Sequence, residues 1–155
     1  DTYHLYQMVI TLVYQAQERK HGSTIILDMN STPMPISGQV LRPPLDLRQP
    51  YLLNLAASLA KVDGALQIGA DLHLHGFAWL LDGKAFPGDE LARGARYNSA
   101  LRFTAENRNV IAIVISSDRP VSVMHQGIDF CAAIPWGQRQ GSVYPLESFE
   151  EWANR

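Results

Sequence analysis

The sequence predicts an α/β domain with a mixed central β-sheet flanked by helices. Three segments have apolar residues at the spacing of an amphipathic helix, and short runs rich in β-branched and apolar residues lie between them. Glycine, proline and polar clusters separate these runs as turns and loops. The order of helix, strand, helix, strands, helix and strands is typical of helices that pack on the faces of a sheet.

The first part of the chain predicts two helices, one strand and a proline-rich segment. Apolar residues recur at helical spacing over 5–16, and this helix is expected to end near Gly22. The segment STIILD, residues 23–28, is typical of a short buried strand. The five prolines within 29–50 predict a loop or a set of extended turns. A proline suited to a first helical turn opens the second helix, which is expected over 50–61.

The remainder of the chain predicts strands on both sides of a third helix. A strand over 64–68 and a second over 72–81 are joined by a GAD turn as an antiparallel pair. After a polar loop over 82–90, the stretch RGARYNSALRF begins a helix that runs to about Glu106. The last predicted elements are strands over 109–117, 121–125 and 128–134 and a short amphipathic helix over 146–154.

Composition limits the functional classes. A chain of 155 residues with 46% hydrophobic residues is expected to form one domain over 1–155 with a substantial core. The net charge of -2 argues against the basic face of a nucleic-acid-binding protein. No apolar run approaches the roughly 18 residues of a membrane span and no secretory signal opens the chain, so a cytoplasmic location is expected. The chain starts without methionine, so we expect it to be part of a longer protein.

The first candidate for chemistry is Asp63, which lies between a predicted helix end and a predicted buried strand. A carboxylate at such a boundary is hydrogen-bonded, exposed or bound to a cation, because burying a bare charge costs too much. The neighbouring Gly64 lets another group approach the backbone closely. The alternative interpretation is a turn aspartate followed by a flexible glycine.

The second candidate is the start of the third helix, where Gly94, Ala95 and Arg96 follow one another. A helix N-terminus has unpaired N–H groups and a partial positive charge, so it favours an anion. An arginine adds a charge-assisted pair of hydrogen bonds to phosphate. The alternative is a solvated arginine beside a loop, because one arginine near one glycine is a weak motif.

Together these segments resemble the diadenylate cyclase domain family, which includes the catalytic domain of the DNA integrity scanning protein. The family signatures are DGA, then a Gly-Thr-Arg-His-Arg-Ala-Ala run, then a buried strand ending in Ser-Glu-Glu. The corresponding segments here are DGA over Asp63–Ala65, GARYNSA over Gly94–Ala100 and IVISSD over Ile113–Asp118. HGSTIIL also resembles the family's first-strand Gly-Ala-Leu-Ile-Val pattern, so the resemblance covers most of the chain.

The resemblance implies a diadenylate-cyclase-like fold and the condensation of two ATP molecules into cyclic di-AMP with Mg²⁺ or Mn²⁺. It implies that Asp63 holds the metal and helps to activate the ribose 3′-hydroxyl, with Asp118 as a further metal ligand. Since each domain holds one ATP, the reaction needs two domains face to face, which implies a homodimer or higher oligomer. The implied nucleotide-binding residues are Gly64, Ala65, Gly76, Phe77, Gly94, Ala95, Arg96, Tyr97, Asn98, Ser116 and Ser117.

Several motif positions depart from the family. Ala95, Tyr97 and Asn98 stand where the family has threonine, histidine and a second arginine, and Ser117 and Asp118 replace the two glutamates. Each hydrogen bond to a charged group contributes ~1.5–3 kcal/mol, so losing two would weaken triphosphate binding or turnover by roughly 100- to 10,000-fold. A pocket with fewer cations should also favour cyclic di-AMP, which carries less charge than two ATP molecules. These departures favour a degenerate nucleotide sensor within a signalling or defence protein, with an active cyclase and a purely structural domain as alternatives.

Two histidines and one cysteine have simpler interpretations. His73 and His75 alternate on a predicted strand, so they share a face and suit zinc if one or two further ligands lie nearby. An exposed strand face explains them as well. If the family resemblance holds, the strand lines the nucleotide pocket, with a histidine or Phe77 near the base. The single Cys131 excludes a disulfide within the chain, and its apolar neighbours predict a buried, inert thiol.

Overall fold

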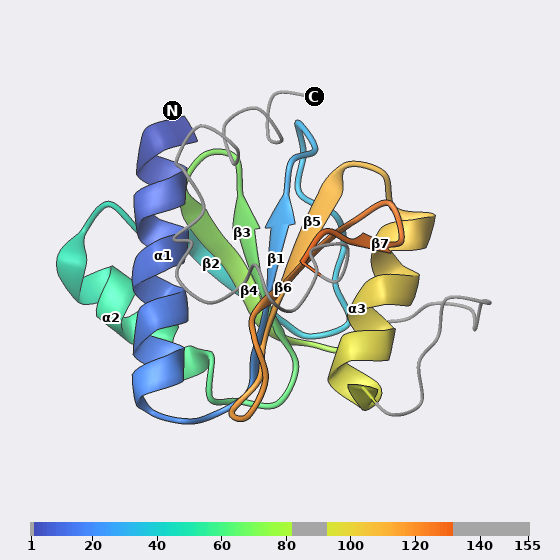
Figure 1. Cartoon of the computed structure of the whole chain (residues 1–155). Coiled ribbons are helices and arrows are strands. Elements are labelled where there is room, and N and C mark those ends of the chain that lie inside the picture. Colours follow the sequence, from blue (N-terminus) through green and yellow to red (C-terminus); the bar gives the residue numbers. More distant parts are fainter. Residues whose placement is uncertain (1, 82–92, 132–155) are drawn as a thin grey trace.

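The computed structural model describes residues 2–81 and 93–131, which fold around one mixed β-sheet (Figure 1). The helices are α1 Thr2–Glu18, α2 Pro50–Leu59 and α3 Ala95–Glu106, and the strands are β1 Ser23–Asp28, β2 Gln39–Asp46, β3 Ala65–Gly69, β4 His73–Trp79, β5 Val110–Ile115, β6 Ser122–His125 and β7 Ile128–Asp129. The seven strands lie in the order β2-β4-β3-β1-β5-β6-β7. β1 and β3 are parallel, and the other neighbouring pairs are antiparallel.

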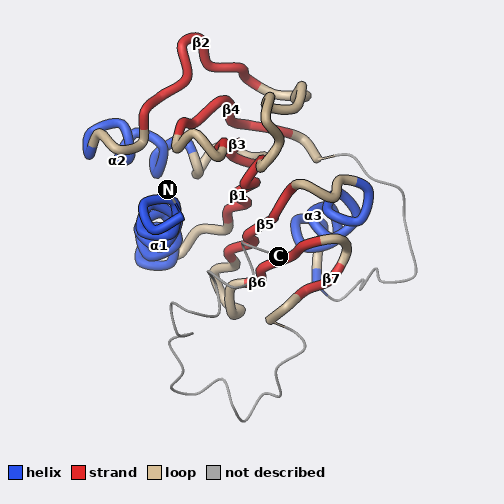
Figure 2. Tube along the Cα trace, turned by 90° about the horizontal axis from the view of Figure 1, so that it is seen from above, coloured by secondary structure: helices blue, strands red, loops and turns tan. Residues whose placement is uncertain are grey.

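Helices cover both faces of the sheet, with α1 and α2 on one face and α3 on the other (Figure 2). Side chains alternate along β1: Ile25 and Leu27 pack with α1 and α2, whereas Ile26 packs with α3. Because both faces of β1 and β5 are covered, these two strands are buried along their whole length. The predicted class, an α/β domain with a mixed sheet flanked by helices, is confirmed.

Most of the predicted elements lie where their patterns indicate. The three helices occur as predicted, and so do the strands expected over 23–28, 64–68, 72–81, 109–117 and 121–125, with ends that shift by a few residues. The loop predicted over 82–90 and the helix predicted over 146–154 lie outside the described residues. No helix in the described ranges is long and apolar enough to cross a membrane.

The prediction of a loop or turns throughout 29–50 was wrong, because part of this segment forms β2. β2 is the outermost strand on its side of the sheet, so one side of its backbone has no partner strand within the described part of the chain. Its ladder with β4 joins residues at its two ends and shifts register between Val40 and Leu45, across Pro43 and Pro44. Proline lacks the N–H that a central strand must donate, but an edge strand with a bulge tolerates it.

The strand predicted over 128–134 was wrong in extent, because β7 ends at Asp129. One carboxylate oxygen of Asp129, Oδ1, accepts the backbone N–H of Cys131 at 3.0 Å. Such a bond from an aspartate to the N–H two residues later is typical of a turn, so it ends the strand. Cys131 is half-buried rather than fully buried, and residues 132–134 lie outside the described part.

Candidate functional site

A pocket of about 490 Å³ lies at one edge of the sheet beside the N-terminus of α3. Residues at the starts of β1, β3 and β6 and at the ends of β4 and β5 line it. These ends meet at one edge because β4 and β5 run antiparallel to their neighbours. Segments that are far apart in the sequence therefore form one wall, which includes Thr24, Ala65, Trp79, Val114 and Ser122.

The DGA turn brings Asp63 to this pocket, where the carboxylate is exposed. Gly64 follows with a φ of 109°, a conformation that glycine adopts readily. A Cβ on Gly64 would lie 2.5 Å from the carbonyl carbon of Ala78 and 2.8 Å from the nitrogen of Trp79. The backbone of the turn therefore packs directly on the end of β4, and a side chain at residue 64 would push the two apart.

The N-terminus of α3 opens toward the same pocket. Gly94 is the N-cap, with a φ of 87°, and no side chain of residues 2–81 or 93–131 caps the helix. Among the described residues, no heavy atom lies within 4 Å of the point that a Cβ on Gly94 would occupy. The first turn contains Arg96 and no acidic residue. Unpaired N–H groups, the helix dipole and this arginine make the region electropositive and suited to an anion.

The guanidinium of Arg96 extends from α3 across to Gly22, immediately before β1. A Cβ on Gly22 would overlap Nη1 of Arg96 and lie 3.0 Å from its Cζ. The absence of a side chain at residue 22 is therefore what leaves room for the guanidinium. Arg96 and Asp63, which are far apart in the sequence, both line the one pocket.

Tyr97 and Arg93 also line the pocket. Tyr97 is buried, and its hydroxyl donates to Oδ2 of the buried Asp129 at 2.9 Å. The guanidinium carbon of Arg93 lies 4.2 Å from the centroid of the Tyr97 ring, within the range of a cation–π contact. The Tyr97 hydroxyl is therefore engaged inside the protein, while its ring supports a cation.

Asp63 supplies the pocket with a carboxylate, a group that binds divalent cations. Asp63 is the one carboxylate among the described residues that line the pocket. Asp118 does not line it, and its Oδ1 accepts the Ser116 hydroxyl at 2.8 Å. No group of three or more histidine, cysteine, aspartate or glutamate side chains in residues 2–81 and 93–131 is arranged to hold a metal ion. One carboxylate together with substrate phosphates is nevertheless a common way to bind Mg²⁺.

The predicted site residues divide into two groups. Those that line the pocket are Asp63, Gly64, Ala65, Gly94, Ala95, Arg96, Tyr97 and Ser116, and those that do not are Gly76, Phe77, Asn98, Ser117 and Asp118. Phe77 packs toward α1 and α2, on the other face of the sheet, and Gly76 lies against the side chain of Ile36. Asn98 is buried in α3.

The pocket is also lined by residues that were not among the predicted site residues, although Arg93 was considered as a substitute for the lost cation. Arg93 and Arg119 join Arg96, so three guanidinium groups belong to this wall. Trp79 and Leu80 add an apolar surface. The Trp79 and Phe103 rings pack edge to face, with 4.9 Å between their centroids. The signal for Arg93 was its position next to Gly94. Nothing in the local sequence around Arg119 distinguishes it from a surface turn residue.

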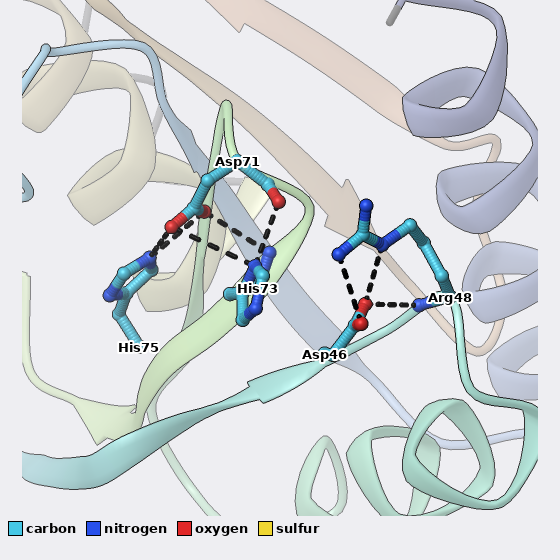
Figure 3. A network of polar contacts seen from close by, with 5 residues as sticks. All are labelled: Asp46, Arg48, Asp71, His73 and His75. Carbon is cyan, nitrogen blue, oxygen red and sulfur yellow. Dashed lines mark hydrogen bonds and ion pairs between the residues drawn. The ribbon is translucent and has the colours of Figure 1, made fainter.

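His73 and His75 lie away from this pocket, in the polar network of Figure 3. Nε2 of His75 lies 2.9 Å from Oδ2 of Asp71, and Nδ1 of His73 lies 2.8 Å from the Asp71 carbonyl oxygen. Asp46 lies opposite His73 on the neighbouring strand, but its Oδ1 accepts a hydrogen bond from Nε of Arg48 at 2.8 Å. Both imidazoles are thus engaged by Asp71, and the described residues give them no zinc-binding group.

Comparisons with known proteins identify a family and similar folds. The family model described as DisA bacterial checkpoint controller nucleotide-binding matches residues 11–128. Among solved structures, the chain is similar to a double mutant of DacA from Staphylococcus aureus, at 19% identity and a TM-score of 0.67, over 83% of this chain and 86% of that one. It is also similar to a hypothetical membrane spanning protein from Bacillus cereus, at 20% identity and a TM-score of 0.65, over 80% of this chain and 61% of that one. No curated protein sequence matches the chain.

Proposed function

We propose that this chain, which belongs to the DisA bacterial checkpoint controller nucleotide-binding family, binds an adenine nucleotide in the pocket beside α3. The proposed ligands are ATP and cyclic di-AMP, which the protein senses with little or no turnover. One observation carries the proposal: Asp63, Arg96 and the uncapped N-terminus of α3 line a single pocket. A helix N-terminus beside a guanidinium is suited to phosphate groups.

The remaining walls suit an adenosine. The pocket volume of about 490 Å³ is in the range of small-molecule sites, which are mostly apolar with a few polar groups. Trp79, Leu80 and Val114 contribute apolar surface to the same pocket as the charged residues. A ligand with a flat apolar base and an anionic tail matches this division, and a nucleotide has both.

Low turnover is supported by the positions where the motif has changed. Tyr97 stands in the place of the family histidine, and its hydroxyl is bound to Asp129. Asn98 stands in the place of the second arginine, and it is buried and does not line the pocket. Ser117 and Asp118, in the places of the two glutamates, do not line the pocket either. Groups that would act on a reacting triphosphate are therefore fewer here than in the family motif.

An active diadenylate cyclase is the second candidate, and a specific observation favours it. Asp63 is retained and exposed at the pocket, and Arg93, Arg96 and Arg119 line the same wall. A divalent cation held by Asp63 and the phosphates would neutralise charge on the triphosphate. The arginines would do the same and would orient the phosphates, which is most of what phosphoryl transfer requires.

Calorimetry and mass spectrometry distinguish the two candidates. The protein is titrated with ATP and with cyclic di-AMP, and it is incubated at high concentration with ATP and Mn²⁺ before mass spectrometry. A sensor should bind at least one ligand, show a higher melting temperature with it, and form no cyclic di-AMP over hours. Failure of both nucleotides to bind would refute the proposed function.

Asp63→Asn and Asp118→Asn form a matched pair, because each removes one carboxylate and only Asp63 lines the pocket. With Mn²⁺ present we expect Asp63→Asn to weaken ATP binding and Asp118→Asn to leave it unchanged. If the wild type forms cyclic di-AMP and Asp63→Asn abolishes it, the protein is a cyclase and the sensor proposal fails.

A further inference from the structure

Arg93 lies immediately before the motif that carries the family resemblance, and its side chain lines the pocket. The side chain is 23% exposed. Its guanidinium carbon lies 4.2 Å from the centroid of the Tyr97 ring, and its Nη2 donates to the hydroxyl of Ser122 at 3.3 Å. Contacts with α3 and β6 therefore restrict where this guanidinium points.

Asp129 does not occupy the hydrogen-bond donors of Arg93. Its Oδ2 accepts the Tyr97 hydroxyl at 2.9 Å, and its Oδ1 accepts the N–H of Cys131 at 3.0 Å. Nη2 of Arg93 lies 3.9 Å from Oδ2, which is beyond hydrogen-bond distance. Nε of Arg93 is buried and has no hydrogen-bond partner among the described residues. The carboxylate orients the guanidinium by charge, and donors of the guanidinium remain for another acceptor.

We propose that Arg93 is a phosphate-binding residue of this pocket and that Tyr97 and Asp129 position it. The inference rests on the proposed nucleotide-binding function. Arg93 and Arg96 stand on either side of Gly94, the N-cap of α3, so the open N–H groups of the helix lie beside two guanidinium groups. An arginine before the helix thus replaces the cation that is lost at Asn98, within the helix.

The same arrangement explains the tyrosine at the family's histidine position. The Tyr97 ring is a flat surface on which a guanidinium stacks, and its hydroxyl reaches Asp129 on β7. Tyr97 therefore acts on a ligand through Arg93, and its own hydroxyl is not the donor. Tyr97→Phe keeps the ring but frees Oδ2 of Asp129, which then attracts Arg93 more strongly and away from the ligand.

Titration calorimetry with ATP, AMP and adenosine tests the role of Arg93. We expect Arg93→Gln to weaken ATP binding by about 10- to 100-fold, the effect of one charge-assisted hydrogen bond, and to leave adenosine binding unchanged. Arg93→Lys keeps the charge without the planar fork, so it should lose less affinity. Tyr97→Phe should also lower the affinity for ATP relative to adenosine. Arg108→Gln is the matched control, because Arg108 is exposed near the opposite end of α3 and does not line this pocket.

The possible outcomes separate this inference from the proposed function. If the wild type binds neither ATP nor cyclic di-AMP, the proposed function fails and the role of Arg93 fails with it; if it binds only cyclic di-AMP, the same variants are titrated with that ligand in place of ATP. If the wild type binds ATP and Arg93→Gln binds it equally well, the role of Arg93 alone is refuted. An equal loss of ATP and adenosine affinity would show that Arg93 only maintains the pocket, and it would refute phosphate binding as well. If Arg93→Gln does not fold, the ratio of ATP to adenosine affinity in Arg93→Lys decides the question.

Discussion

Gly22→Ala is expected to weaken nucleotide binding with little effect on stability. The new Cβ would overlap Nη1 of Arg96, so this guanidinium has to leave its position beside β1. The Arg96 guanidinium is the end of a flexible side chain on an exposed residue, so it can move at a low cost in free energy. The backbone remains relaxed, because Gly22 is not among the residues with a positive φ.

The size of each effect follows from these contacts. Of the three heavy atoms nearest to the new Cβ, two belong to the Arg96 guanidinium and one to the backbone, the carbonyl oxygen of Ile115 at 3.4 Å. This is an ordinary contact, so we expect the free energy of unfolding to change by less than about 1 kcal/mol. Loss of a charge-assisted hydrogen bond from Arg96 to phosphate costs about 1.5–3 kcal/mol, which is roughly a 10- to 150-fold higher Kd for ATP.

Calorimetric titration with ATP and thermal unfolding without ligand measure the two quantities separately. Arg96→Gln should produce the same loss of affinity, and the double variant should be no weaker than Arg96→Gln, since both changes remove one interaction. If Gly22→Ala binds ATP with wild-type affinity while Arg96→Gln binds it more weakly, the reasoning is refuted. A large drop in melting temperature would refute it too.

Three further changes test the framework. Gly64→Ala should lower the free energy of unfolding by about 3 kcal/mol, because its Cβ would lie 2.5 Å from a backbone carbon of Ala78 at a φ of 109°; an unchanged urea midpoint would contradict this. Asp28→Ala should also cost about 3 kcal/mol in urea unfolding, because the buried carboxylate accepts Gln67 Nε2 at 2.9 Å and the N–H of Met34 at 2.7 Å, and both of these hydrogen bonds would be lost. The pKa of Asp71 lies below its ordinary value of 3.8: partial burial raises it, but hydrogen bonds from His75 and the His73 N–H, and the charges of both imidazoles, outweigh that effect. A carboxyl group with a lowered pKa in the folded state stabilises the protein above pH 3.8, and this stability is lost as the pH falls through the folded-state pKa. Urea unfolding at pH 5 and at pH 3 should therefore show a larger loss of stability for the wild type than for Asp71→Asn.

Apolar periodicity predicted most elements because each has a simple pattern of burial. In α1, the residues that recur at helical spacing are buried, namely Leu5, Met8, Leu12 and Ala16, and Val13 beside them is half-buried. β2 was missed because prolines oppose a strand in general, and only its position at the edge of the sheet makes them acceptable. Edge position is a property of the strand order, which local sequence does not encode.

The site was predictable only in part, for a similar reason. Asp63 and Arg96 have local features, a turn glycine and a helix start, so the sequence identifies them, and the structure brings both to one pocket. Phe77 was assigned to that pocket although it faces α1 and α2, because a strand pattern does not say which face a residue occupies. The interaction of Arg93 with Asp129 depends on how β7 packs beside α3, which no local pattern near Arg93 contains.

The outer strands of the sheet affect how copies of this domain can assemble. On one side, Pro43 and Pro44 interrupt the hydrogen-bonding row of β2, and on the other side β7 spans only Ile128–Asp129. Within the described ranges, neither border offers an incoming chain the long, regular series of donors and acceptors that strand addition requires. Oligomers formed through the described residues would therefore be joined by side-chain surfaces, and their geometry would be open to adjustment by single substitutions.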